Sequence, residues 1–278
     1  MVDPVLNQPD GLFAEENIVS TTTLAPMPIA SPLPAALKER GVLIVGGSSG
    51  IGLAAAALLT GLGARVTLIA RDPARLSAAV DGLRATPGAS VLGVAGDGTD
   101  EAVLEQAIER AGQVDHVLVT AGSLAVGALL DTPHQQVRAA VEGRIWGAYG
   151  AARAVARHLP AAGSLTLSSG LYVTRPIAGA AASIAGIGAV EALTRALAVE
   201  LAPRRLRVNA IRYGVVDTPL SRAAMGAPDA AAMAAAGAAA PLGRFATADE
   251  AASAVLFLMA NNFVTGTVVT VDGGQSLI

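Results

Sequence analysis

The sequence predicts an α/β protein with a single doubly wound, parallel sheet of seven strands and helices on both faces of the sheet. Short runs rich in Val, Leu and Ile alternate from Val42 onward with longer, alanine-rich amphipathic segments. The short runs are continuously apolar, which is typical of parallel strands buried on both faces. The units follow one another without a linker or a repeat, and 278 residues suit one large domain better than two.

The expected strands follow in order along the chain, with expected helices between them. The alanine-rich stretch 223–243 follows the sixth strand, and we interpret it as a mobile helical lid rather than as a low-complexity segment. The strands are expected at residues 42–46, 65–70, 90–95, 116–121, 164–169, 207–212 and 267–272.

The chain before the first strand has a different composition. Residues 1–36 are rich in proline, and we predict an N-terminal extension that lies on the surface or wraps a neighbouring chain. A partly mobile tail has the same composition. The domain then spans residues 37–278. A basic segment followed by an apolar one is missing near the N-terminus, so we expect no secretory signal and a cytoplasmic protein.

The composition excludes several classes of site. The sequence contains no cysteine, which excludes disulfides, thiolate metal sites and cysteine nucleophiles. Its three histidines, His116, His134 and His158, lack helical spacing, so no metal site is expected. The net charge is −3 with scattered basic residues, so no nucleic-acid partner is expected. The mean hydropathy is +0.54, but glycine or charge interrupts every apolar run before the roughly 18 residues of a membrane span.

A glycine- and serine-rich turn lies between the first expected strand and its helix. Gly46, Gly50 and Gly52 have the spacing G-x-x-x-G-x-G. Such glycines let backbone N–H groups approach a diphosphate, and the helix N-terminus adds positive potential. An ordinary tight turn has a similar composition, but the position between strand and helix favours a dinucleotide site of the Rossmann type. The expected contacts are Gly46, Ser48, Ser49, Gly50, Ile51 and Gly52.

Five motifs in the same order make residues from about 40 to 278 resemble the short-chain dehydrogenase/reductase family. They are GGSSGIG (46–52), GDGTD (96–100), VDHVLVTAG (114–122), RVNAIRYGVVDTPL (207–220) and FVTGTVVTVDGG (263–274). The chain departs from the family at Val45, where threonine is usual, and at Val119 and Thr120, where two asparagines are usual.

The resemblance implies a nicotinamide cofactor and further contacts to it. Asp97 and Gly98 would lie at the adenine, and Ala121 and Gly122 would end the strand beneath the cofactor. The backbone of Val216 and the hydroxyl of Thr218 would hold the nicotinamide carboxamide.

The end of the second strand favours NADP over NAD. In the family the acid of NAD-binding members falls on Ala70, whereas Arg71 falls where NADP-binding members keep a base. Arginine also matches phosphate geometry. A solvated surface arginine is the alternative for Arg71, and Asp72 is explained by capping the next helix.

The family's catalytic tyrosine and lysine are absent. Aligning VEALTRALAVEL (190–201) puts them on Ser183 and Ile187, whereas counting from the catalytic serine puts them on Ala182 and Gly186. Lys38, before the first strand, is the only lysine in the chain. This pair normally supplies the proton for carbonyl reduction, a contribution of about 10²–10⁴ in rate.

Two other family positions carry the predicted catalytic residues. Ser169 falls on the catalytic serine, although a hydroxyl that merely bonds the backbone would look the same. Arg144 falls on the catalytic asparagine, and the alternative is a surface arginine on an amphipathic helix. Arg144 together with the SSG (168–170) and RP (175–176) motifs resembles fungal bifunctional reductases/Diels–Alderases, but the aspartate of that subgroup is missing near Gly179.

We therefore expect an NADP(H)-binding oxidoreductase of this family with a remodelled active site. It would transfer hydride to an activated C=C, C=N or C=O bond of a small molecule in a secondary or specialised pathway. A non-redox cyclase or pericyclase and a catalytically silent family member are the alternatives. We expect a homodimer or homotetramer that binds neither nucleic acid nor membrane.

Overall fold

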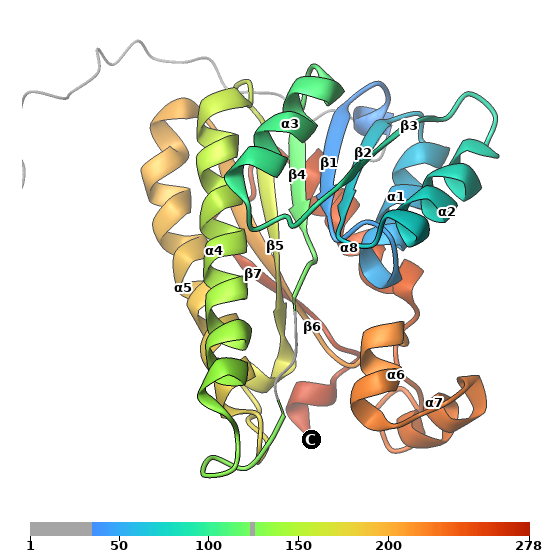
Figure 1. The fold of residues 1–278 in the computed structure, drawn as a ribbon, viewed down its shortest axis with the longest axis vertical. Helices are drawn as coiled ribbons and strands as arrows, with labels where there is room; N and C mark the ends of the chain where they lie inside the picture. The colour runs from blue at the N-terminus through green and yellow to red at the C-terminus, as the bar shows by residue number, and fades with distance from the viewer. Residues whose placement is uncertain (1–34, 123–125) are drawn as a thin grey trace, which may run out of the picture.

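A computed structural model describes residues 35–122 and 126–278. Seven parallel strands form one sheet in the order β3-β2-β1-β4-β5-β6-β7 (Figure 1). The fold class predicted from the sequence is confirmed, and the strand ends differ from the expected ones by at most two residues. The strands are β1 (Gly41–Val45), β2 (Arg65–Ala70), β3 (Ser90–Ala95), β4 (His116–Val119), β5 (Ser164–Gly170), β6 (Arg207–Tyr213) and β7 (Val268–Val271).

Helices cover both faces of the sheet (Figure 1). One face packs against α1 (Gly50–Gly61), α2 (Pro73–Arg84) and α8 (Ala248–Ala260). The other face packs against α3 (Glu101–Ala111), α4 (His134–His158) and α5 (Ala181–Leu201). The expected lid is helical, as α6 (Pro219–Met225) and α7 (Ala230–Gly237), and its mobility stays a prediction.

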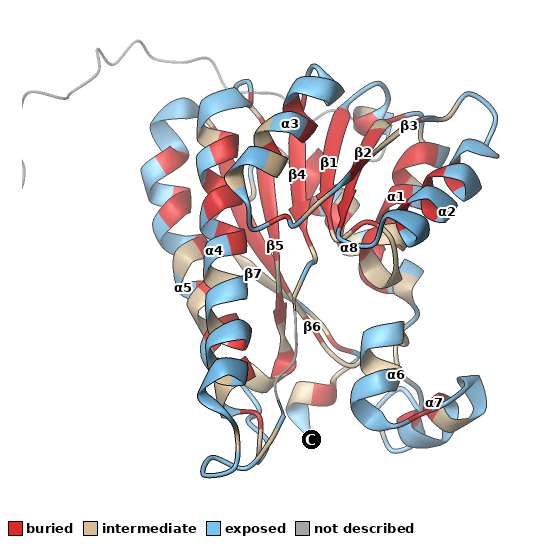
Figure 2. Ribbon diagram, in the orientation of Figure 1, coloured by how far each residue is buried: buried red, intermediate tan, exposed pale blue. Residues whose placement is uncertain are grey.

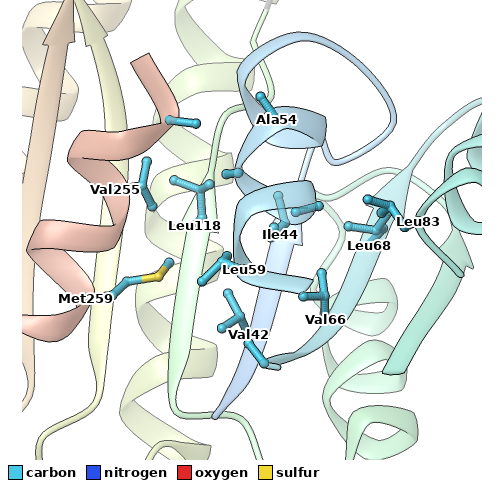
Figure 3. Close-up of a cluster of buried hydrophobic side chains, with 14 of the residues drawn as sticks. Val42, Ile44, Ala54, Leu59, Val66, Leu68, Leu83, Leu118, Val255 and Met259 are labelled. Atoms are coloured by element: carbon cyan, nitrogen blue, oxygen red, sulfur yellow. The ribbon is translucent and has the colours of Figure 1, made fainter. Parts of the chain in front are cut away.

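A hydrophobic core lies between each face of the sheet and the helices that cover it. The strands are buried along most of their length (Figure 2). Alternate residues of β1 enter opposite cores: Val42 and Ile44 face α1 and α8, whereas Leu43 and Val45 face α3 and α4. Figure 3 shows the first core, in which Leu59 of α1 packs with small aliphatic side chains. Burial on both faces is the reason these strands are continuously apolar.

Most of the expected N-terminal extension lies outside the described residues. Ala35–Leu37 forms a short 3-10 turn, η2, and Leu37 is fully buried in the first core. Ala36 also packs against this core, and the expected boundary at residue 37 stays a prediction.

One described helix is long and apolar enough to cross a membrane by length and composition. Within its span, Ala181–Arg204, an 18-residue stretch has a mean hydropathy of 1.4, and 44% of that stretch is buried inside the protein. It contains α5, which packs on β5, β6 and α4, so the core accounts for its apolar face.

Buried polar groups form hydrogen bonds at the amino ends of β1, β4 and β5. Asp115 accepts hydrogen bonds from the Gly41 backbone N–H at 2.8 Å and from Arg40 at 3.3 Å. The next residue, His116, lies 2.9 Å from the Ser164 hydroxyl through its Nδ1 atom. Burial, with the nearby Arg207 charge, lowers the pKa of His116 to about 3.

His116 makes acid stability a testable property. The imidazole is neutral in the folded protein, so its contribution is complete above the ordinary pKa of 6.5 and is lost as the pH falls toward 3. We expect His116→Gln to flatten this loss, which has a maximum slope of about 1.4 kcal/mol per pH unit. Urea unfolding between pH 7 and 4 measures it, with the exposed His134→Gln as control. Equal slopes in all three proteins would contradict the prediction.

Candidate cofactor and substrate site

The turn between β1 and α1 brings backbone groups close together because its glycines lack side chains. Gly46 has a positive φ of 91°, and a Cβ atom there would lie 2.8 Å from the Ala121 backbone nitrogen. A Cβ atom on Gly52 would collide with the Gly46 carbonyl and lie 2.7 Å from the Thr120 hydroxyl. The turn therefore packs directly on the carboxyl end of β4.

The N-terminus of α1 is open to an anion. Ser49 is the N-cap residue, but its side chain makes no capping hydrogen bond. The first-turn N–H groups, together with the half-buried Ser48 and Ile51, are therefore placed as a diphosphate site requires. Gly50 has a φ of 52°, and a Cβ atom there would lie 3.2 Å from Thr218 Cγ2. The structure thus joins two predicted cofactor contacts that are distant in sequence.

The expected adenine side lies at the ends of β2 and β3. Gly98 packs so closely on Val45 that a Cβ atom would collide with that side chain. Asp97 accepts hydrogen bonds from the backbone N–H and the hydroxyl of Thr99, at 2.9 and 3.0 Å. Arg71 is exposed at the end of β2. Asp72 caps α2 by accepting from the N–H groups of Ala74 and Arg75, so the capping interpretation is confirmed.

The expected nicotinamide side is an extended segment after β6. Ala246 bonds the Val215 carbonyl at 3.3 Å and the Asp217 N–H at 2.8 Å. Val216 lies between these two bonded residues. Its own N–H and carbonyl groups have no backbone partner within the described part of the chain. A carboxamide could pair with both groups. The Thr218 hydroxyl caps α6 by accepting from the Ser221 N–H at 3.2 Å.

The structure distinguishes the two alignments of the missing catalytic pair. A Cβ atom on Gly170, at the end of β5, would lie 3.5 Å from Ile187 Cδ1. Gly186 instead faces α4, where a Cβ atom would lie 2.7 Å from the Ala140 carbonyl. Ser183 and Ile187 therefore occupy the positions that face the carboxyl end of β5. An apolar isoleucine lies where the lysine would be.

Arg144 reaches across from α4 to the end of β4. A Cβ atom on Gly122 would lie 2.6 Å from its Nη2 atom and 2.7 Å from its Nε atom, so the guanidinium rests on the glycine backbone. Its Nε atom is buried and has no hydrogen-bond partner among the described residues. Burial lowers the pKa of the guanidinium from its ordinary value. The sequence-predicted residues Arg144, Ala121 and Gly122 thus meet at one place.

Ser169 belongs to a buried network that the sequence analysis missed. Its hydroxyl donates to the Glu191 carboxylate at 2.7 Å, and Arg212 donates two hydrogen bonds to the same carboxylate, at 2.9 and 2.7 Å. Burial raises the pKa of Glu191, but the bonds from Arg212 and Ser169 outweigh it and hold the pKa below its usual range. A detectable signal was the acid four residues after Ile187, on the same face of an apolar helix.

Two tyrosines lie near the carboxyl edge of the sheet. Tyr213 packs into the α1–α8 core, and its hydroxyl has no partner among the described residues. Burial raises the pKa of that hydroxyl, whereas a proton donor at neutral pH needs a lowered value. Tyr172 is half-buried in the 3-10 turn η3 (Leu171–Val173).

The loops beyond the carboxyl ends of the strands expose many large apolar side chains. The β4–α4 and β5–α5 loops are joined by a hydrogen bond from Gly127 N–H to the Gly179 carbonyl at 2.8 Å. We call these exposed side chains the apolar rim. Its members are Val126, Leu129, Leu130, Ile177, Leu220, Met225, Leu242, Leu277 and Ile278.

The parallel seven-stranded sheet with helices on both faces and the glycine-rich turn between β1 and α1 together define a Rossmann-like protein. The chain belongs to the short-chain dehydrogenase/reductase family. A family model described as Enoyl-(Acyl carrier protein) reductase matches residues 45–276.

Several relatives match nearly the whole domain. The short-chain dehydrogenase/reductase ATR9 from Stachybotrys chlorohalonatus is 32% identical over 263 residues, covering 87% of this chain and 98% of the relative. The solved structure of the MalC reductase/Diels-Alderase from Malbranchea aurantiaca is 30% identical with a TM-score of 0.80, covering 88% and 99%. A Pseudomonas aeruginosa PAO1 short chain oxidoreductase described as containing an atypical catalytic center is 30% identical with a TM-score of 0.79, covering 86% and 97%.

Proposed function

We propose that the protein is an NADP(H)-dependent reductase that transfers hydride to a conjugated C=C bond of an apolar small molecule. The observation that carries this proposal is the buried Arg144 guanidinium, whose Nε–H group has no hydrogen-bond partner among the described residues and lies beside Gly122. A buried N–H group of a cation without an acceptor is costly, so it favours a substrate that brings negative charge or develops it during the reaction.

The reaction needs no tyrosine. Bound NADPH would supply a hydride to the β-carbon of an enone. The electron pair of the C=C bond would then shift toward the carbonyl group, which would become an enolate with negative charge on its oxygen. Arg144 would stabilise that charge electrostatically, and water can protonate the α-carbon afterwards. An iminium substrate also needs no acid, but the cation of Arg144 would repel it.

Other features support this substrate class. Apolar Ile187 lies at the position of the family's polar lysine, beside Gly170, and the apolar rim surrounds the same edge of the sheet. The matching family model is described as a reductase of enoyl groups, which are conjugated C=C compounds. The similarity to the MalC reductase/Diels-Alderase also supports a reductase.

Substrate-dependent oxidation of NADPH tests the proposal. We expect turnover of an apolar cyclic enone and little or no turnover of the matched saturated ketone, because only the ketone needs a strong proton donor. Robust reduction of the saturated ketone would contradict the mechanism and direct attention to Tyr172. Binding of NADPH without oxidation of it by any enone would contradict the redox assignment.

A second candidate is a non-redox cyclase or pericyclase. The observation in its favour is the similarity to the MalC reductase/Diels-Alderase. However, no acidic residue lies near Gly179, so the aspartate expected of the Diels–Alderase subgroup is missing here. Conversion of a linear diene–dienophile substrate without NADPH consumption would favour it.

Cofactor preference is a separate prediction. The exposed Arg71 lies at the end of β2, where it would meet the 2′-phosphate of NADP. We expect NADPH to bind more tightly than NADH, and Arg71→Ala to remove most of the difference, about tenfold for one charge-assisted contact. Calorimetry with both cofactors measures it, and Arg75→Ala, at an exposed arginine on the following helix α2, is the control. Equal wild-type affinities would contradict the assignment.

We also propose a homodimer or homotetramer. Trp146 and Tyr149 on α4 and Val199 on α5 are large, exposed apolar side chains on the outer helical layer. Light scattering measures the assembly, and a monomer would contradict the proposal.

A further inference from the structure

The C-terminal turn contacts the segment that we expect to hold the nicotinamide. The Gln275 side chain accepts a hydrogen bond from the Val215 N–H at 3.1 Å through its Oε1 atom. Gln275 is 8% exposed and begins the 3-10 turn η5 (Gln275–Leu277). Figure 1 shows the C-terminus at the same edge of the sheet as the lid helices α6 and α7.

The same turn is itself fixed from several sides. Asp272 accepts from the N–H groups of Gly274 and Ser276, both at 2.9 Å. Arg175, in the loop after β5, donates to the Gln275 carbonyl at 2.7 Å. Gly214 packs against the turn, since a Cβ atom there would lie 3.0 Å from Gln275 Nε2.

The backbone on either side of Val216 is therefore held at three points. Gln275 holds the N–H of Val215, while Ala246 holds the carbonyl of Val215 and the N–H of Asp217. These bonds set the peptide planes around Val216 and leave its own N–H and carbonyl groups without a backbone partner in the described chain. The two bonds to Ala246 are between backbone groups. Only the bond to Gln275 has a side-chain acceptor, so a substitution can remove it.

We propose that Gln275 is a positioning residue for the nicotinamide end of the cofactor, acting through Val215 on the backbone of Val216. The proposal rests on the proposed cofactor. Gln275 follows β7, which lies at the opposite edge of the sheet from β2 and β3, so its substitution should leave the adenosine part of the site unchanged.

The experiment compares the binding of NADP⁺ with that of adenosine 2′,5′-bisphosphate, which lacks the nicotinamide. Gln275→Met keeps the length of the side chain and removes the acceptor. We expect it to weaken NADP⁺ binding by roughly five- to tenfold, the scale of one hydrogen bond, and to change bisphosphate binding by less than about twofold. Gln275→Glu retains an acceptor and should recover most of the NADP⁺ affinity.

Ser276→Ala is the matched control, because it alters the same turn without removing the acceptor for Val215. It should leave both affinities near wild type. Equal weakening of both ligands in Gln275→Met would show a general structural role and overturn the proposal, as would no weakening of either. A wild-type protein that binds the bisphosphate but gains nothing from the nicotinamide would also overturn it. Failure of wild type to bind either ligand would overturn the cofactor assignment itself.

Discussion

Replacing Arg144 with alanine should lower activity on a conjugated enone by roughly 10²- to 10³-fold, the scale for losing one electrostatic stabiliser of a developing oxyanion. Affinity for NADPH should change much less, because the diphosphate turn and Arg71 lie on other elements. Arg144→Lys should restore activity only in part, since a point charge lacks the planar fork of the guanidinium. Steady-state NADPH oxidation and calorimetry measure the two effects.

The same residue should weaken the folded protein while it serves the reaction. Its guanidinium is buried on Gly122, and its Nε–H group has no partner among the described residues. Arg144→Met, which keeps the apolar part of the side chain, should therefore leave the free energy of unfolding unchanged or raise it. Arg138→Ala, at an exposed site on the same helix, is the control and should affect neither property. Loss of the fold in Arg144→Met, or full activity in Arg144→Ala, would make Arg144 structural.

Replacing Glu191 with glutamine should lower the free energy of unfolding by about 3 kcal/mol, the low end for breaking a buried ion pair. Glu191 is 4% exposed and bonds both Arg212 and Ser169, so its loss leaves a partly buried guanidinium without its counter-charge. Urea unfolding at pH 7 measures the change.

The control is Glu142→Gln, which breaks the exposed pair with Arg138 and should cost less than about 1 kcal/mol. The double substitution Glu191→Leu and Arg212→Leu should recover much of the loss, because replacing both partners removes the unpaired charge. Ionised Glu191 stabilises the fold at pH values above its ordinary pKa of 4.5, and this contribution is lost as the pH falls through its lowered folded value. The difference in free energy of unfolding between wild type and Glu191→Gln should therefore become smaller as the pH falls. A difference that stays constant with pH would contradict the charge-based explanation.

The sequence by itself determined the fold class and the place of the glycine-rich turn before α1. Continuous apolar runs are required wherever strands are covered on both faces, so β1 to β7 were visible within two residues. The turn was recognisable from the spacing of Gly46 and Gly52. Both positions need glycine because the packing of the turn on β4 leaves no room for a Cβ atom. The lack of a tyrosine–lysine pair was also settled by the sequence, since Lys38 is the only lysine.

Only the tertiary structure decided which side chains meet. Sequence spacing left two alignments for the catalytic pair, and the helix packing that directs Gly186 toward α4 and Ile187 toward β5 resolved them. The Ser169–Glu191–Arg212 network and the hydrogen bond from the Val215 N–H to Gln275 join residues between 21 and 60 positions apart. Local pattern reports which face of an element is buried, but a hydrogen bond or ion pair depends on the distance between elements, and that distance is set by the packing of the whole domain.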